Sequence, residues 1–365
     1  MPNNYPDALY VHVPFCLRIC PYCDFCKVIY RPEWSKPYLD ALYAEAKARQ
    51  CGLFSTIYVG GGTPSALPDE EFEELLFFLH QHIKQEGEFS IECNPENVTE
   101  TKVALMKRFG IDRVSLGVQS FQPESLKTLG RRHDKQTVLN AIGLLRKYGI
   151  TNINLDWMYG FPGQSEESLR ADIEDFLSCD VPHLSAYSLI LEEGTTFSAK
   201  KVKPLEDDVQ QDYFELIMAA LAEHGYERYE ISNFAKPGYR CRHNLTYWHD
   251  ERYVAIGLGA SGYIGNKRYQ NTKNLQKYLN GEYFGSEEEL SRDGELMDYM
   301  LTNLRLIEGF SLAEFEKRFG MTFDSHYHTQ FARMEREGLL VEDSGRIHAT
   351  KRGLDLLDYI CLELF

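Results

Sequence analysis

Three cysteines stand close together near the start of the chain. Cys16, Cys20 and Cys23 are spaced C-x3-C-x2-C within the stretch Leu9–Lys27, LYVHVPFCLRICPYCDFCK, directly after a short β-branched and aromatic run. Thiolates are the usual protein ligands of iron–sulfur clusters, so these three can hold three irons of one 4Fe–4S cluster. The fourth iron has no ligand from this motif, and a small molecule could chelate it.

Two other interpretations of the cysteines are a zinc knuckle and buried thiols that hold no metal. Zinc sites usually combine one close cysteine pair with a second pair, or with histidines, further along the chain. No second close pair follows here. The spacing therefore favours a cluster.

The motif, with Tyr22 before its third cysteine, resembles that of the radical S-adenosylmethionine (SAM) superfamily. This resemblance implies that the open iron binds the amino and carboxylate groups of SAM. The flanking segments YVHVPFC and CPYCDF are similar to those of the oxygen-independent coproporphyrinogen oxidase branch, and within it to heme chaperones. The similarity continues almost to the last residue.

Polar or glycine-rich segments follow several strand-like runs. GGGTP (60–64) follows the second run, and the next three end near Glu92, Gln119 and Asp156. Working groups of α/β barrels lie at such strand ends, and burying polar groups without partners is costly. Consecutive glycines allow close backbone approach and would leave amides exposed to a ligand. Taken singly, the glycines could form only a tight turn, and each carboxylate could be a helix cap or a surface charge.

The family resemblance assigns a cofactor role to a set of these residues. GGGTP matches the segment near the methionine moiety of SAM, and Arg131 stands in LKTLGRRH, where the adjacent Arg132 leaves the register open. Tyr10 matches a tyrosine that packs on the cofactor, although a strand aromatic in the core explains it equally well. The cofactor-binding residues that the resemblance implies are Tyr10, Gly61, Gly62, Thr63, Glu92, Gln119, Arg131, Asp156 and, on the adenine side, Ile190.

A second motif, HNxxYW at 243–248, resembles a signature of the heme chaperone branch. Imidazole is a common axial ligand of heme iron, so the motif predicts His243 as a heme ligand, with Cys241 as the alternative thiolate. The other interpretation is a hydrogen-bonded core histidine. Ser261, in AIGLGASG, stands where many relatives carry a histidine.

Strand-like and helix-like segments alternate six times, which predicts an α/β fold with a parallel sheet. The resemblance implies a partial (β/α)6 barrel, and periodicity alone also permits a doubly wound sheet. The predicted pairs are Leu9–Phe15 with Pro37–Arg49, Thr56–Val59 with Asp69–Gln81, Phe89–Glu92 with Thr99–Phe109, Val114–Val118 with Gln136–Tyr148, Ile153–Met158 with Glu166–Leu177, and Leu184–Leu189 with Val209–His224.

The rest of the chain predicts two further regions after a barrel over residues 1–225. Residues 226–290 are expected to form a β-rich extension, which opens with a strand over Gly225–Ala235. Residues 291–365 are expected to form a smaller winged-helix-like α+β domain, and its acidic-leaning recognition segment MEREGLLVEDSG argues against DNA binding. Its predicted elements are helices over Glu295–Ile307, Leu312–Phe319 and Thr329–Glu337, a hairpin over Gly338–Ala349 and a last helix over Lys351–Leu364.

Composition restricts the compartment and the partners. A formal net charge of −16 over 365 residues argues against a general nucleic-acid binder. Nine cysteines, an odd number, do not resemble a disulfide framework, and reduced cluster ligands suit the cytoplasm. The segment Met1–Tyr10 lacks the pattern of a signal peptide, and no apolar run approaches membrane-spanning length. Peripheral membrane contact and a homodimer stay open.

Two departures from the sequence pattern of the oxidases favour a heme chaperone over an oxidase that decarboxylates coproporphyrinogen. The oxidases usually carry their extra cysteine two residues after the third ligand, where Phe25 stands here; Cys26 comes one residue later. They also carry an N-terminal extension, whereas fifteen residues precede Cys16. We therefore expect a protein that binds a cluster, SAM and heme and passes heme to acceptor proteins, such as membrane respiratory proteins. An oxidase, or another radical SAM enzyme that modifies tetrapyrroles, is the alternative.

Overall fold

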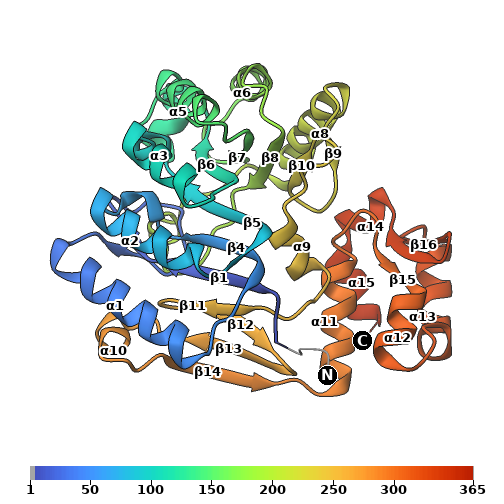
Figure 1. Ribbon diagram of the computed structural model, residues 1–365. Coiled ribbons are helices and arrows are strands. Elements are labelled where there is room, and N and C mark those ends of the chain that lie inside the picture. The colour runs from blue at the N-terminus through green and yellow to red at the C-terminus, as the bar shows by residue number, and fades with distance from the viewer. Residues whose placement is uncertain (1–4, 365) are drawn as a thin grey trace.

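The structure is a computed structural model that describes residues 5–364. Residues 1–4 and 365 lie outside the described residues. The first four belong to the predicted N-terminal segment and to the predicted barrel region, and residue 365 belongs to the predicted last domain. The largest element is a nine-stranded sheet of order β11-β1-β4-β5-β6-β7-β8-β10-β9 (Figure 1). Its strands are β1 (Ala8–Val13), β4 (Phe54–Gly61), β5 (Ile83–Cys93), β6 (Arg113–Gln119), β7 (Asn152–Tyr159), β8 (His183–Ser188), β9 (Glu227–Arg228), β10 (Asn233–Ala235) and β11 (Val254–Ile256).

Six of these strands lie in the sheet in the same order as in the chain, and all pair in parallel. A doubly wound sheet would reverse its strand order at a switch point, and this run from β1 to β8 has none. The edges of the sheet are β11 and β9, so it stays open. The predicted α/β fold of the partial-barrel type is confirmed, and the doubly wound alternative is wrong.

Helices follow each of the six strands and form an outer layer on the sheet (Figure 1). Side-chain caps fix several of their starts: Thr99, Asp134 and Ser165 each accept a backbone N–H of the first turn. The helices are α1 (Pro32–Ala48), α2 (Asp69–His80), α3 (Glu100–Arg108), α4 (Pro123–Thr128), α5 (Lys135–Lys147), α6 (Glu166–Ser178), α7 (Thr196–Ala199) and α8 (Asp207–Glu223).

The stretch Gly225–Ala235, which we predicted as one strand, forms the two short antiparallel strands β9 and β10. The reason is a turn between them: the Arg228 guanidinium donates to the carbonyls of Glu230 and Ile231. β10 pairs with β8 and β11 pairs with β1, so residues 226–290 contribute to the main sheet. A separate three-stranded sheet comprises β12 (Ser261–Ile264), β13 (Lys267–Asn271) and β14 (Phe284–Glu289), with α10 (Leu275–Leu279) between its last two strands.

The HNxxYW motif lies on a short helix, α9 (Arg242–Trp248). Glu88 of β5 accepts hydrogen bonds from the backbone N–H groups of Arg242 and His243, which are otherwise unpaired at a helix start. These hydrogen bonds fix α9 against strand β5 of the main sheet.

The last region has its own apolar core, centred on residues such as Met300, Phe315 and Ile360. It lies beside the main sheet (Figure 1). The prediction of one continuous last helix is wrong. The segment breaks at Leu356 into two helices, α14 (Lys351–Asp355) and α15 (Leu357–Leu364). The predicted hairpin is present, with a turn at Ser344 and Gly345, both of positive φ. The elements are α11 (Arg292–Asn303), β15 (Phe310–Ser311), α12 (Leu312–Phe319), α13 (Asp324–Arg336), β16 (Leu340–Asp343), β17 (Arg346–Ala349), α14 (Lys351–Asp355) and α15 (Leu357–Leu364).

We propose this region as a separate domain because its core is distinct; the boundary at residue 225 stays a prediction. Among residues 5–364, no helix combines the length and the apolar character that crossing a bilayer requires.

Candidate functional site

Cys16 ends a short strand, and Cys20 and Cys23 lie on the loop that joins this strand to its partner. β2 (Phe15–Cys16) pairs in parallel with β3 (Val28–Ile29), which fixes both ends of the loop. Within it, Cys23 N–H donates to the carbonyl of Cys20 at 3.2 Å. All three cysteines line a single cavity of about 420 Å³. The loop therefore presents its thiols to one common space.

Polar groups from distant segments contact two of the sulfurs. Arg131 Nη1 donates to Cys20 Sγ, and Thr63 Oγ1 donates to Cys16 Sγ, each at 3.7 Å. Burial raises the pKa of the Cys16 thiol to about 11. Metal binding must displace such protons, and nearby donors stabilise the thiolate that forms.

These residues fit a 4Fe–4S cluster better than a single ion. Among the described residues, no group of three or more His, Cys, Asp or Glu side chains is arranged to hold one metal ion. A cluster spreads its ligands over several irons, so three thiols around a shared cavity satisfy it where a lone zinc would need closer convergence. Hydrogen-bond donors on the sulfurs are among the features that tune such clusters.

Most residues predicted to bind SAM line the same cavity. All but Arg131, which lies in the loop between α4 and α5, come from the carboxyl-terminal parts of neighbouring strands or the residues just after them, as expected for a barrel-type sheet. The predicted residues that line it are Gly61, Gly62, Thr63, Glu92, Gln119, Arg131, Asp156 and Ile190.

The glycine run serves close packing. Gly61 has φ +113°, and a Cβ there would lie 2.6 Å from the His12 ring. The expectation that this run leaves its amides exposed is wrong for its last residues. Gly61 N–H donates to Glu92 Oε2 at 3.1 Å, and the N–H groups of Gly62 and Thr63 donate to backbone carbonyls of residues 13 and 15 at 2.8 Å.

Two half-buried carboxyl groups give the cavity an acidic wall. Glu92 accepts hydrogen bonds from Tyr58 at 2.9 Å and from Gly61, while Asp156 accepts from Ser115 at 3.0 Å and from Asn154 at 2.8 Å. Burial, and then the nearby charge of Asp156, raise the pKa of Glu92 to about 7. Burial also raises the pKa of Asp156. A cationic ligand would relieve both effects, and a sulfonium is such a ligand.

Arg131 lines the same cavity and contacts the cysteine loop. It donates to Asn94 Oδ1 at 2.8 Å and to the Gly117 carbonyl, in addition to Cys20. The cavity lining thus combines basic side chains, among them Arg131, with carboxyls, among them Glu92 and Asp156, which suits a ligand that carries both a carboxylate and positive charge.

Gln119 carries backbone strain at the cavity. Its φ is +68° at an irregularity in the pairing of β6 with β7, a conformation that costs roughly 1–3 kcal/mol for a residue other than glycine. The strain turns the strand end so that this residue lines the cavity.

Tyr10 and His243 do not line the cavity. The Tyr10 hydroxyl pairs with His12 Nδ1 at 3.0 Å, and its ring stacks on that of Tyr58. His243 is fully buried behind Tyr58, and its ring nitrogens pair with Thr56 at 2.8 Å and Tyr247 at 2.7 Å. Heme ligation by His243 stays a prediction, and it would require the ligating ring nitrogen to lose its present hydrogen bond.

Cys241, the alternative ligand, is also buried, and its thiol donates to Glu88 at 3.6 Å. Burial raises the pKa of this thiol to about 12.

Several cavity residues were missed from the sequence, including Tyr58, Asn94 and Tyr187. Tyr58 offers a signal in retrospect, since it lies two residues before the glycine run on the same strand. Asn94 follows Glu92 by two residues and so lies on the same strand face. For Tyr187 we find no such signal.

Comparison with known proteins fits this geometry. The family model described as the radical SAM superfamily matches residues 10–176, and that of the HemN C-terminal domain matches residues 290–356. The heme chaperone HemW of Lactococcus lactis is 37% identical, with 96% of this chain and 95% of the relative covered. The chain belongs to the HemW family. Family members from Bacillus subtilis (34% identity, 95% and 96% covered) and Escherichia coli (33%, 99% and 98%) match over similar lengths.

The fold of this HemW family member is also that of a solved structure. Coproporphyrinogen III oxidase (HemN) of Escherichia coli, described as a radical SAM enzyme, matches with a TM-score of 0.87 at 23% identity, over 99% of this chain and 90% of the other. Membership of the radical SAM superfamily implies a 4Fe–4S cluster and SAM, the two groups that the cavity fits.

Proposed function

We propose that the protein is a heme chaperone that binds a 4Fe–4S cluster, SAM and heme and passes heme to acceptor proteins. The observation that carries the proposal is the convergence of three thiols, the Arg131 guanidinium and the carboxyls of Glu92 and Asp156 on one cavity, in a chain that matches HemW relatives over nearly its full length. The name of these relatives, heme chaperone, supports heme as the cargo.

In this proposal the residues have distinct tasks. Cys16, Cys20 and Cys23 would hold the cluster, with Arg131 and Thr63 donating to two of the sulfurs. Glu92 and Asp156 would face the positive charge of SAM. A reduced cluster with SAM bound supplies electron transfer to the sulfonium. The protein orients the ligand and keeps water from it.

Anaerobic reconstitution tests this function. Protein loaded with iron, sulfide and SAM is titrated with heme, mixed with an apo-acceptor and then incubated with coproporphyrinogen and a reductant. We expect saturable heme binding, heme transfer and no decarboxylation. Conversion of coproporphyrinogen III to protoporphyrinogen IX would identify an oxidase instead, and absence of heme binding would reject the chaperone.

The nature of the acceptors, such as membrane respiratory proteins, and a cytoplasmic location form the finer part of this proposal. Peripheral membrane contact and a homodimer stay predictions from the sequence. Cosedimentation with lipid vesicles and light scattering of the loaded protein test them.

A further inference from the structure

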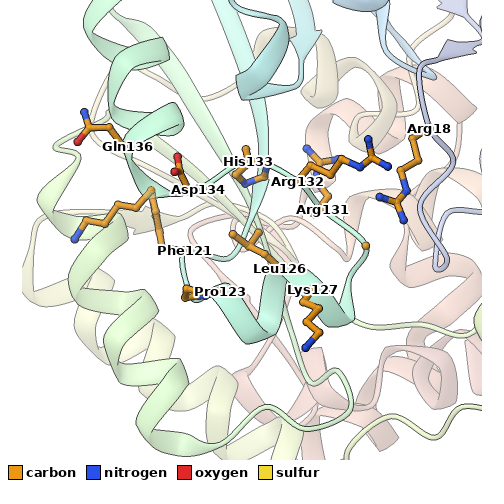
Figure 2. A pocket seen from close by; sticks show the side chains of 12 residues that line it. Arg18, Phe121, Pro123, Leu126, Lys127, Arg131, Arg132, His133, Asp134 and Gln136 are labelled. Carbon is orange, nitrogen blue, oxygen red and sulfur yellow. The ribbon is translucent and has the colours of Figure 1, made fainter.

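A second cavity, of about 530 Å³, lies beside the cysteine loop. Arg18 of that loop lines it together with residues from 121 to 136, which include α4 and the start of α5. Figure 2 shows the side chains of Arg18, Arg131 and Arg132 gathered on one side of this cavity, away from Gln136. Arg18 and Arg131 also line the first cavity, so the two cavities are neighbours. We call the second one the arginine pocket.

The arginine pocket is basic in a chain of net charge −16. Its charged lining comprises five basic side chains and one acidic one: Arg18, Lys127, Arg131, Arg132 and Lys135 against Asp134.

Some of these charges are already used within the protein. Lys135 pairs with Asp175 at 2.5 Å, Lys127 lies 3.6 Å from Glu124, and Asp134 caps α5. Arg18 and Arg132 have no hydrogen-bond or ion-pair partner among residues 5–364. Their guanidinium groups are therefore available to a ligand.

Buried polar atoms at the arginine pocket also lack partners. His133 is 5% exposed, and its Nδ1 lies 3.6 Å from Glu96 Oε2. Its Nε2 has no hydrogen-bond partner within the described part of the chain. The Nε atom of Arg131 is buried and unpartnered as well. Such groups are costly unless something supplies an acceptor, which points to an anionic ligand.

Apolar surface adjoins this charge. Phe121 and Leu126 are buried in the wall of the arginine pocket. Around the mouth of the neighbouring cavity, Ile19, Phe25 and Ile190 are 37%, 63% and 67% exposed. Large apolar side chains exposed together mark a binding surface more often than chance does. A ligand that satisfies both features is a flat apolar molecule with carboxylates at one edge.

We propose that the arginine pocket binds the propionate carboxylates of the heme, while the heme macrocycle lies against Ile19 and Phe25. Arg18 and Arg132 donate to the carboxylates, a geometry for which guanidinium groups are suited. This inference rests on the proposed heme chaperone function and assigns the cargo a position next to the cluster.

The test compares heme with heme dimethyl ester, in which both propionates are neutral. Each is titrated by absorbance into the cluster-loaded protein with SAM, in wild type and in the Arg18→Gln/Arg132→Gln variant. We expect the variant to bind heme at least about tenfold more weakly, the loss that one charge-assisted hydrogen bond represents, and to bind the ester as wild type does. The Lys277→Gln/Lys317→Gln variant, on exposed parts of α10 and α12, removes the same charge elsewhere and should bind heme normally.

Other outcomes separate this inference from the function on which it rests. Equal weakening of heme and ester in the variant, or equal binding of both by wild type, would overturn the arginine pocket as the carboxylate site while leaving the chaperone function intact. Failure of wild type to bind either would overturn both. An unchanged thermal unfolding midpoint, expected for two exposed arginines, excludes misfolding as the cause of a loss.

Discussion

The hydroxyl of Tyr58 donates a hydrogen bond to Glu92 at 2.9 Å, while the ring of the same tyrosine stacks on His243 at a centroid distance of 5.4 Å. Tyr58 therefore separates the cavity lined by the three cysteines from the HNxxYW helix. The carboxyl is on the cavity side and the imidazole is in the packed interior. This arrangement gives the two residues different expected responses to mutation.

Glu92→Gln should stabilise the protein without its ligands at pH 8 and weaken SAM binding. The folded pKa of Glu92, about 7, exceeds the ordinary 4.5, so the folded state holds a proton that the unfolded state has lost. Stability therefore falls as pH rises from about 4.5 to 7, by up to roughly 3 kcal/mol. Thermal unfolding at pH 5 and pH 8 measures this: the variant should gain stability at pH 8 alone. Equal gains in stability at both pH values would contradict the raised pKa of Glu92 as the origin of the effect.

His243→Ala should lower stability and leave the heme Soret band unchanged. The substitution removes a buried ring and leaves the hydroxyls of Thr56 and Tyr247 without their partner, at a cost of about 2–4 kcal/mol. Chemical denaturation and the heme spectrum of the variant are the measurements. A shifted or missing Soret band in a folded variant would instead establish the ligation predicted from the sequence.

Cys20→Ala should abolish the 4Fe–4S absorbance after anaerobic reconstitution, because the motif has only three thiols for three irons. Cys26→Ala is the matched control, since Cys26 lies on the same loop but does not line the cavity. Iron and sulfide analysis of both variants gives the result. Retention of about four irons per chain in Cys20→Ala would show that Cys26 or another thiol can serve instead.

Gly61→Ala should destabilise the protein by more than Gly163→Ala. Both glycines have positive φ, at +113° and +81°, so both substitutions strain the backbone. Only Gly61 adds a collision, with the His12 ring at 2.6 Å, whereas Gly163 has nothing within 4 Å. The difference in the free energy of unfolding between the two variants, measured by chemical denaturation, gives the cost of the collision with His12. We expect this cost at roughly 1–3 kcal/mol. Equal losses would mean that His12 moves aside freely.

The sequence predicted the strand-end residues well because their positions follow from local patterns. Glu92, Gln119 and Asp156 end or approach the end of continuous apolar runs, and parallel strands bring such ends to one edge. The surroundings of His243 were out of reach for the opposite reason. Its partner Thr56 lies 187 residues away in the chain, and nothing in HNxxYW indicates that both nitrogens are engaged.

The break at Leu356 was equally hidden. Gly353 precedes it in a segment of helical composition, and the reason for the glycine is tertiary. A Cβ there would lie 1.9 Å from the carbonyl of Leu339.

The contact between Arg131 and Cys20 joins residues 111 positions apart. During synthesis at about 5–20 residues per second, the thiol leaves the ribosome roughly 5–20 s before the guanidinium that will donate to it. Throughout that interval the thiol of Cys20 lacks this hydrogen bond and is open to oxidation or to the wrong metal. The order of the chain therefore delays this hydrogen bond to Cys20 until at least four of the six parallel strands have been synthesised.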